Sequence, residues 1–182
     1  LNNISPGNDL RFSIEKIEAA RNFANKLWNA SRFVIMNLEN EDGSFKEMAN
    51  EKTAQLKPED KWMMQIVSDA VKEITVNMEN YELALAANKI YELIWNQYCD
   101  WYIELVKARL YGNDEEDKKT ARYALLAVLK DLLKLLHPYM PFITEEIWGY
   151  LPKEEGVKEF LMLEAWPKVL TEDYSKDVAI LN

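Results

Sequence analysis

The stretch ARNFANKLWNASRFVIMN, residues 20–37, decides how this chain folds. Its apolar residues recur every three or four positions, the period of one face of an α-helix. Extended in both directions, the pattern predicts a helix over residues 13–38, with Ser13 as its N-cap. The predicted buried stripe consists of Ile17, Ala20, Ala24, Leu27, Ser31, Val34 and Leu38.

The same period predicts four more helices, because strand-like alternation is scarce and only 5 Gly are present. We expect them at about 58–78, 81–111, 114–137 and 141–151, with a polar loop at 40–57. The predicted fold class is all-α, an antiparallel helical bundle of about five helices with a short irregular C-terminal extension. In the helix at 114–137 the expected stripe is Ala121, Leu125, Val128, Leu132 and Leu135.

The segment 81–111 is the longest predicted helix, and it carries two apolar stripes. One stripe contains Leu83, Ala87, Ile90, Ile94, Trp101, Leu105 and Ala108, and the other contains Tyr91, Trp95, Tyr98 and Tyr102. Two apolar faces need neighbours on two sides, so we expect this helix at the centre of the bundle.

Length and composition indicate one domain in a reducing compartment, and we expect it to be cytoplasmic. The chain has 182 residues and one cysteine, which permits no internal disulfide. No apolar run approaches the ~20 residues that span a bilayer, and the N-terminus has neither the basic nor the apolar part of a signal peptide. Because it begins with Leu1, we expect a fragment of a longer polypeptide.

Chemistry of its own is not predicted for this chain. One His and one Cys are too few for a soft-ligand metal site, and a Cys99 nucleophile would need a histidine partner. Asp100 and Glu104 lie one turn apart, which leaves a paired-carboxylate enzyme as an alternative that predicts bound metal. We expect instead a buried thiol, acids that bond a neighbouring helix or loop, and His137 as a structural residue at a helix end. No catalytic and no metal-binding residue is therefore assigned.

The net charge of -9 argues against nucleic-acid binding by the protein as a whole, because phosphate contacts need clustered Lys and Arg. The charge is uneven, however. Residues 11–32 hold five basic and two acidic residues, a net charge of +3, so the remainder carries -12. The one clearly basic segment is the opening helix.

Arg21, Asn25 and Arg32 fall within roughly 40° of one another on that helix, and Asn29 lies just beyond. Asn and Arg are the side chains that read base edges, and Arg also stacks on unpaired bases. Two interpretations remain open. The set either faces a nucleic acid, or it makes interhelical hydrogen bonds that order a protein-interaction module. Trp28, beside the set, is either an edge of the core or a stacking residue.

The residues ARNFANKLWNASRF resemble the start of the anticodon-binding domain of valyl-tRNA synthetases, within the class I synthetases for aliphatic amino acids. Three further segments match in order. Residues 5–12 resemble the segment that follows the catalytic core, 95–104 the third-helix signature, and 137–148 a turn shared with isoleucyl and leucyl enzymes. Ala165-Trp166-Pro167 closes a resemblance that covers roughly residues 5–170.

The resemblance implies a domain that binds the anticodon stem-loop of valine tRNA, with an isoleucyl domain as the alternative. It implies that residues 1–12 connect to a catalytic core, that 13–151 form the bundle, and that 152–182 precede a coiled-coil arm absent from this chain. The family's His-Ile-Gly-His and Lys-Met-Ser-Lys-Ser signatures are also absent. ATP would therefore serve the catalytic domain, which acts in cis, and this part would need no cofactor and would be monomeric. The implied tRNA-binding residues are Arg21, Asn25, Asn29, Arg32, Lys26, Phe45 and Lys46, of which Phe45 is either a base-stacking residue or a loop anchor.

Overall fold

The computed structural model describes residues 14–153 and 156–175, and in this part of the chain the fold is all-α, as predicted. The long helices are α1 (Ile14–Leu38), α2 (Pro58–Glu79) and α5 (Glu115–Leu136), followed by the short α6 (Pro141–Gly149). A fifth rod is continuous and consists of α3 (Leu83–Glu92), η1 (Leu93–Tyr102) and α4 (Ile103–Leu110). Within the described ranges the only β-type pairing is an isolated bridge between Glu39 and Phe45.

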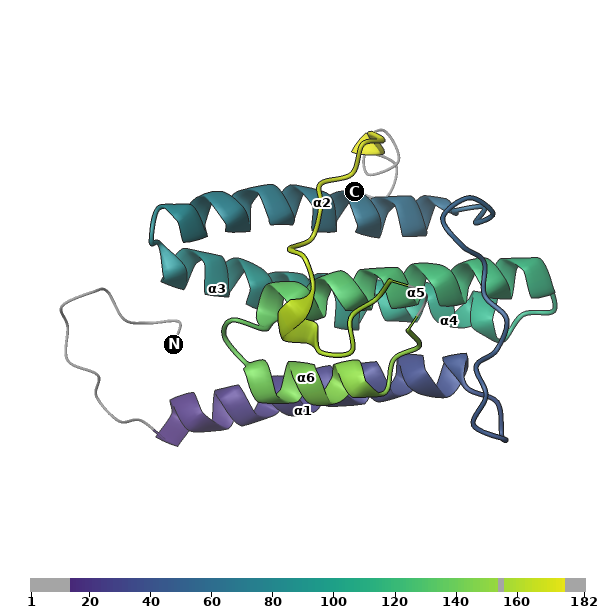
Figure 1. The fold of residues 1–182 in the computed structure, drawn as a ribbon, viewed down its shortest axis with the longest axis horizontal. Coiled ribbons are helices and arrows are strands. Elements are labelled where there is room, and N and C mark those ends of the chain that lie inside the picture. Colours follow the sequence, from purple (N-terminus) through teal and green to yellow (C-terminus); the bar gives the residue numbers. More distant parts are fainter. Residues whose placement is uncertain (1–13, 154–155, 176–182) are drawn as a thin grey trace.

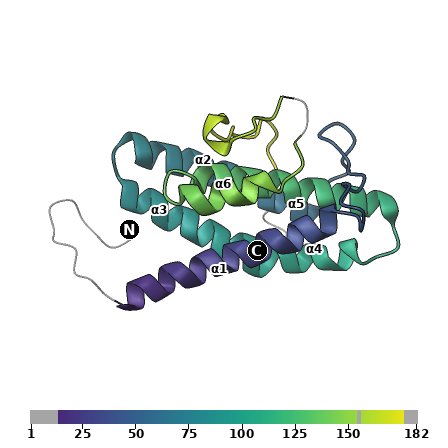
Figure 2. The ribbon, with the colours of Figure 1, turned by 60° about the horizontal axis from the view of Figure 1, so that its bottom comes forward.

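The rods form a layered bundle in which α1 and α6 lie on the opposite side from α2 (Figure 1). The α3–η1–α4 rod and α5 run between these two sides, and α1 packs against η1, α5 and α6. Figure 2 shows α1 crossing the bundle obliquely next to α6. None of the described helices combines the length and the apolarity that crossing a membrane requires.

Helix α5 has more buried residues than any other described helix, because it contacts α1, α2, α3, α4 and α6. All five residues of its predicted stripe are buried. The helix begins at Asp114, whose side chain accepts hydrogen bonds from the backbone N–H groups of Glu116 and Asp117. The expectation that the rod at 81–111 is central is confirmed, but it shares that position with α5.

The first predicted stripe of the long rod is wrong at Leu83, which is 51% exposed, and again beyond Ile94. The π-helix η1 is the reason for the second failure. In a π-helix each backbone hydrogen bond joins residues five apart instead of four. Every later side chain is therefore rotated around the helix axis relative to its position in a regular α-helix. Trp101 is consequently 62% exposed, and Leu105 and Ala108 are exposed with it. Tyr98 and Tyr102 of the second predicted stripe are completely buried, as expected.

The stripe predicted for α1 also fails in its first turns. Ile17 is 53% exposed and Ala20 is exposed, because this end of α1 projects beyond its neighbours (Figure 2). Burial begins at Phe23, whose ring stacks on that of Tyr91 at 5.0 Å, and continues through Ala30. The predicted N-cap, Ser13, and the connecting segment 1–12 lie outside the described residues.

A buried ionic network joins α2, α4 and α5. The Nη1 of Arg109 donates to both carboxylate oxygens of Asp60 at 2.8 Å and to Glu59 Oε1 at 3.0 Å. Its Nε donates to Asp117 Oδ1 at 2.9 Å, and Tyr102, placed by η1, donates its hydroxyl to Asp60 at 2.8 Å. Since Asp60 is fully buried, these donors replace the water that its carboxylate loses on folding.

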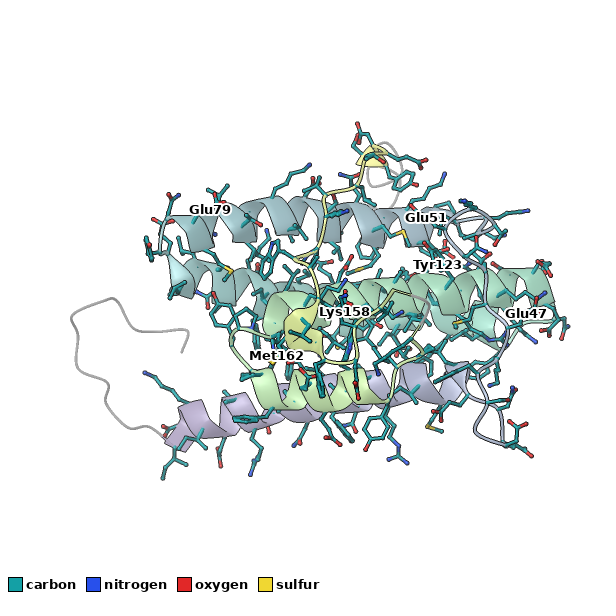
Figure 3. The ribbon with its side chains drawn as sticks, in the orientation of Figure 1. Glu47, Glu51, Glu79, Tyr123, Lys158 and Met162 are labelled. Atoms are coloured by element: carbon teal, nitrogen blue, oxygen red, sulfur yellow. The ribbon has the colours of Figure 1, made fainter. Side chains whose placement is uncertain are left out.

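The described part of the C-terminal extension packs against the bundle. It crosses α6 and α5 and then reaches α2 (Figure 1). The backbone carbonyl of Lys158 accepts a hydrogen bond from the indole N–H of Trp148 on α6. Figure 3 labels Lys158 and Met162 on the part of the extension that crosses α5 and α6. Farther on, Trp166 Nε1 donates to Thr75 Oγ1 on α2 at 2.9 Å. The described extension contains one 3-10 turn, η2 (Leu161–Leu163).

Candidate nucleic-acid interface

The outer ridge of α1 carries four side chains in helical succession, at spacings of four, three and four residues. These are Arg21, Asn25, Trp28 and Arg32. Residues at such spacings follow one another along the same face of a helix. Asn29 lies beside them on the helix surface.

All four predicted polar residues of this face, Arg21, Asn25, Asn29 and Arg32, are exposed. Within the described part of the chain none of them has a hydrogen bond or ion pair with another residue. The alternative in which the set orders the bundle through interhelical hydrogen bonds is therefore wrong for these residues. Their donors and acceptors are directed to solvent and are free to meet a ligand.

Lys26 is arranged differently. Its Nζ lies 2.5 Å from Asp100 Oδ1 on η1 and 3.9 Å from the centre of the Trp95 ring. The ion pair and the cation–π contact both draw the ammonium group toward η1. Lys26 is thus separated from the ridge, and Asp100 offsets its charge.

Phe45 and Lys46 lie at the C-terminal end of α1, where the chain turns back on the helix. Lys46 N donates to Leu38 O at 2.7 Å, and Gly43 takes the positive φ of 81° that the turn requires. Phe45 is 43% exposed, so backbone pairing rather than burial of its ring anchors this loop. Lys46 Nζ lies 3.5 Å from the carbonyl oxygen of Met36, near the negative end of the α1 dipole.

Acidic side chains are absent from α1 after Glu18, although the chain has 31 in total. Glu51 and Glu79 lie near the two ends of α2, on the other side of the bundle (Figure 3). The exposed part of α1 is therefore a locally cationic surface on an acidic protein. Such a surface attracts an anionic ligand at short range even when the net charge repels it.

The residues considered for catalysis have structural surroundings. Burial raises the pKa of the Cys99 thiol to about 12, so the nucleophilic thiolate does not form at neutral pH. Asp100 pairs with Lys26, and Glu104 pairs with Lys107. His137 Nδ1 lies 2.8 Å from Thr144 Oγ1, which ties the end of α5 to α6. In the described ranges no three His, Cys, Asp or Glu side chains gather as a metal site would require.

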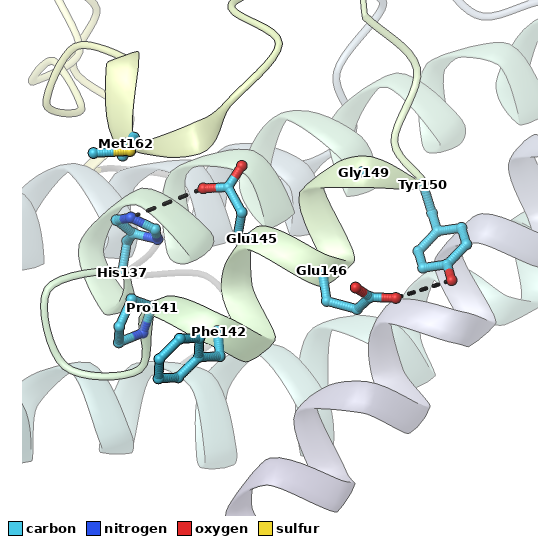
Figure 4. Close-up of a pocket in the computed structure, with 8 residues that line it drawn as sticks. All are labelled: His137, Pro141, Phe142, Glu145, Glu146, Gly149, Tyr150 and Met162. Carbon is cyan, nitrogen blue, oxygen red and sulfur yellow. Dashed lines mark hydrogen bonds and ion pairs between the residues drawn. The ribbon is translucent and has the colours of Figure 1, made fainter.

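One open groove of about 600 Å³ lies between α6 and the extension (Figure 4). Its walls are mainly apolar, and its polar groups are engaged with each other. His137 Nε2 lies 4.0 Å from Glu145, and the Tyr150 hydroxyl donates to Glu146 at 3.0 Å. The groove is lined by His137, Pro141, Phe142, Glu145, Glu146, Gly149, Tyr150 and Met162. It includes none of the polar residues of α1.

The described part of the chain is a helical bundle whose first helix presents exposed amide and guanidinium groups, the kind of surface that binding modules use. A family model described as the anticodon-binding domain of tRNA ligase matches residues 60–181. The chain belongs to this family. The match begins inside α2, so α1 lies outside the segment that the family model covers.

Curated relatives extend the similarity to α1. The valine--tRNA ligase of Bacillus thuringiensis subsp. konkukian is 47% identical over 165 residues, which is 91% of this chain. That of Carboxydothermus hydrogenoformans is 51% identical over 90% of this chain, and that of Bacillus subtilis is 42% identical over 96%. The matched region is 18%, 18% and 19% of these relatives, so this chain spans less than a fifth of their length.

A solved structure shares the fold. The crystal structure of the ternary complex of Agrobacterium radiobacter K84 LeuRS with tRNA and LeuAMS superposes with a TM-score of 0.59. The sequence identity is 17%, and the match covers 93% of this chain and 18% of that one. At this identity the likeness describes the arrangement of the helices alone.

Proposed function

We propose that this chain binds the anticodon stem-loop of a valine tRNA, as the anticodon-binding part of a valine--tRNA ligase. Membership of the anticodon-binding family and the names of its relatives support this proposal. In the parent enzyme the ATP-dependent joining of valine to tRNA belongs to a catalytic domain that acts in cis. The part described here contributes binding and needs no cofactor, and we infer a monomeric, cytoplasmic protein.

The observation that carries the proposal is the free polar face of α1. Arg21, Asn25, Asn29 and Arg32 are exposed and make no contacts of their own with the described residues. Loop bases of an RNA are unstacked enough to be read on their pairing edges, which a duplex does not allow. Amides and guanidinium groups suit those edges, and Arg also attracts the backbone phosphates.

The remaining candidates contribute less directly. Phe45, close to the C-terminal end of α1, has a partly exposed ring. Stacking of a base on such a ring contributes about 1–3 kcal/mol to binding. Lys46 lies next to Phe45 and adds attraction for phosphate. Lys26 adds little while Asp100 holds it, so we expect most of the electrostatic attraction to come from Arg21 and Arg32.

The test is titration of the fluorescently labelled anticodon stem-loop of valine tRNA at low salt. We expect saturable binding that weakens as salt increases. Arg32→Ala should lower the affinity about 5- to 10-fold, since one net hydrogen bond contributes roughly 1–1.4 kcal/mol. Lys72→Ala, on α2, is the matched control because it removes one positive charge from the opposite side of the bundle. Equal affinities for wild type and Arg32→Ala, or equal losses in both variants, would refute the role given to α1.

A further inference from the structure

Trp28 is a large aromatic side chain on the outer ridge of α1, between Arg21 and Arg32. It follows Asn25 by three residues and precedes Arg32 by four, so the three side chains share one face of α1. Its exposed fraction is 39%, whereas Tyr98, Tyr102 and Trp148 of the true core are almost completely buried. Trp28 is therefore not a buried core residue.

A second aromatic ring from a distant part of the chain completes the feature. Tyr150, immediately after α6, lies with its ring centre 6.3 Å from that of Trp28, at an interplanar angle of 82°. Half of Tyr150 is exposed, and its hydroxyl donates to Glu146 Oε1 at 3.0 Å. Figure 4 shows this hydrogen bond and the Tyr150 ring beside the ribbon of α1.

The geometry of the pair leaves an aromatic face available. In an edge-to-face arrangement the edge of one ring covers a face of the other, and this contact does not cover the faces of the ring that supplies the edge. The exposed fractions of Trp28 and Tyr150, 39% and 50%, show that both rings keep accessible surface. The contact with Tyr150 and the Glu146 hydrogen bond restrict the rotation of both rings. A stiff aromatic surface loses little conformational entropy when a ligand stacks on it.

Two arginines on α1 flank the pair, and Glu146 is the acidic group on its α6 side. Arg32 lies about 6 Å and Arg21 about 10 Å from Trp28 along the helix axis, in opposite directions. Aromatic rings interleaved with cationic side chains bind single-stranded nucleic acid, because bases stack on the rings while the cations meet the backbone. The pair and its cations thus complement an unpaired nucleotide, which offers a flat base and an anionic phosphate on each side.

We propose that Trp28 and Tyr150 form a stacking platform for one unpaired base of the tRNA loop, with Arg21 and Arg32 contacting the phosphates that flank it. The inference rests on the proposed function and adds two binding residues to it. One of them, Tyr150, comes from outside α1. The junction of α1 and α6 is then part of the RNA surface, and Glu146 is a positioning residue that holds the Tyr150 ring.

The experiment uses anticodon stem-loops that carry 2-aminopurine at single loop positions, since stacking quenches its fluorescence. We expect wild-type protein to quench one position strongly. Trp28→Leu and Tyr150→Leu should each lower the affinity for the stem-loop, and the loss should be about 5- to 150-fold for the ring on which the base stacks. Both variants should also restore the fluorescence of 2-aminopurine at the quenched position. Trp28→Phe, which keeps an aromatic face, should retain most of both signals.

Tyr81→Leu is the control, because Tyr81 is highly exposed but lies at the turn between α2 and α3. It should bind and quench as wild type does. If wild type binds the stem-loop and both Leu variants bind and quench equally well, the platform is refuted while the proposed function stands. If wild type does not bind the stem-loop, the proposed function fails and the platform fails with it. Melting curves of each variant identify any loss of binding that comes from unfolding.

Discussion

Replacing Arg109 with methionine removes the centre of the buried network while keeping most of the volume of the side chain. The guanidinium group makes five close contacts, two with Asp60, one with Glu59 and two with Asp117. Without it Asp60 remains fully buried and keeps only two donors, the Tyr102 hydroxyl and the backbone N–H of Lys57. Removing one partner of a buried pair in this way costs about 3–5 kcal/mol.

That cost is large against a total unfolding free energy of about 5–15 kcal/mol. For a chain of this size it corresponds to a fall in Tm of roughly 6–20 °C. The free energy of unfolding is measured by urea denaturation, followed by circular dichroism. Arg32→Met is the matched control, because it replaces an exposed arginine with methionine as Arg109→Met replaces the buried one. It should lower the free energy of unfolding by no more than about 0.5 kcal/mol.

The dependence on pH separates charge from packing. Burial already raises the pKa of Asp60 while Arg109 opposes the rise, so loss of Arg109 raises this pKa further. A group whose pKa is raised in the folded state favours folding when protonated, and this stability is lost as pH rises through the folded pKa. The deficit of Arg109→Met should therefore be smaller at about pH 5 than at about pH 7.5. A deficit below about 1 kcal/mol, or one of equal size at both pH values, would refute this account of the network.

Two further changes test the electrostatics of the surface. Asp100→Asn should release Lys26 toward RNA and tighten stem-loop binding severalfold. The slope of log affinity against log salt concentration should become steeper by up to about 0.7. An unchanged slope measured by titration would show that Lys26 stays bound to Trp95. Asp131→Asn should raise Tm at about pH 7.5 but not near pH 4, because burial raises the pKa of Asp131 from 3.8 to about 6 and its ionisation between these values disfavours the folded state. A thermal melt that shifts equally at both pH values would contradict the second expectation.

The candidate site was only partly accessible from the sequence. Helical spacing alone brings Arg21, Asn25 and Arg32 to one face, because spacing in sequence fixes angle around a helix. Spacing does not say whether that face meets solvent or another helix. The exposure of the three side chains in the structure shows that it meets solvent. Lys26 shows the opposite outcome, since its partner Asp100 lies 74 residues away and no local pattern links the two.

The sequence by itself determined the fold class, the helices and most of their bounds, because apolar period and capping residues such as Asp114 are local properties. It also determined that α1 is the cationic helix of an acidic chain. Only the tertiary structure decided that the first stripe of the third rod leaves the core after Ile94, since the π-turns of η1 rotate Trp101 outward, and that Tyr102 meets Asp60. It alone decided that Trp28 meets Tyr150, because packing of α6 on α1 depends on contacts between segments more than a hundred residues apart.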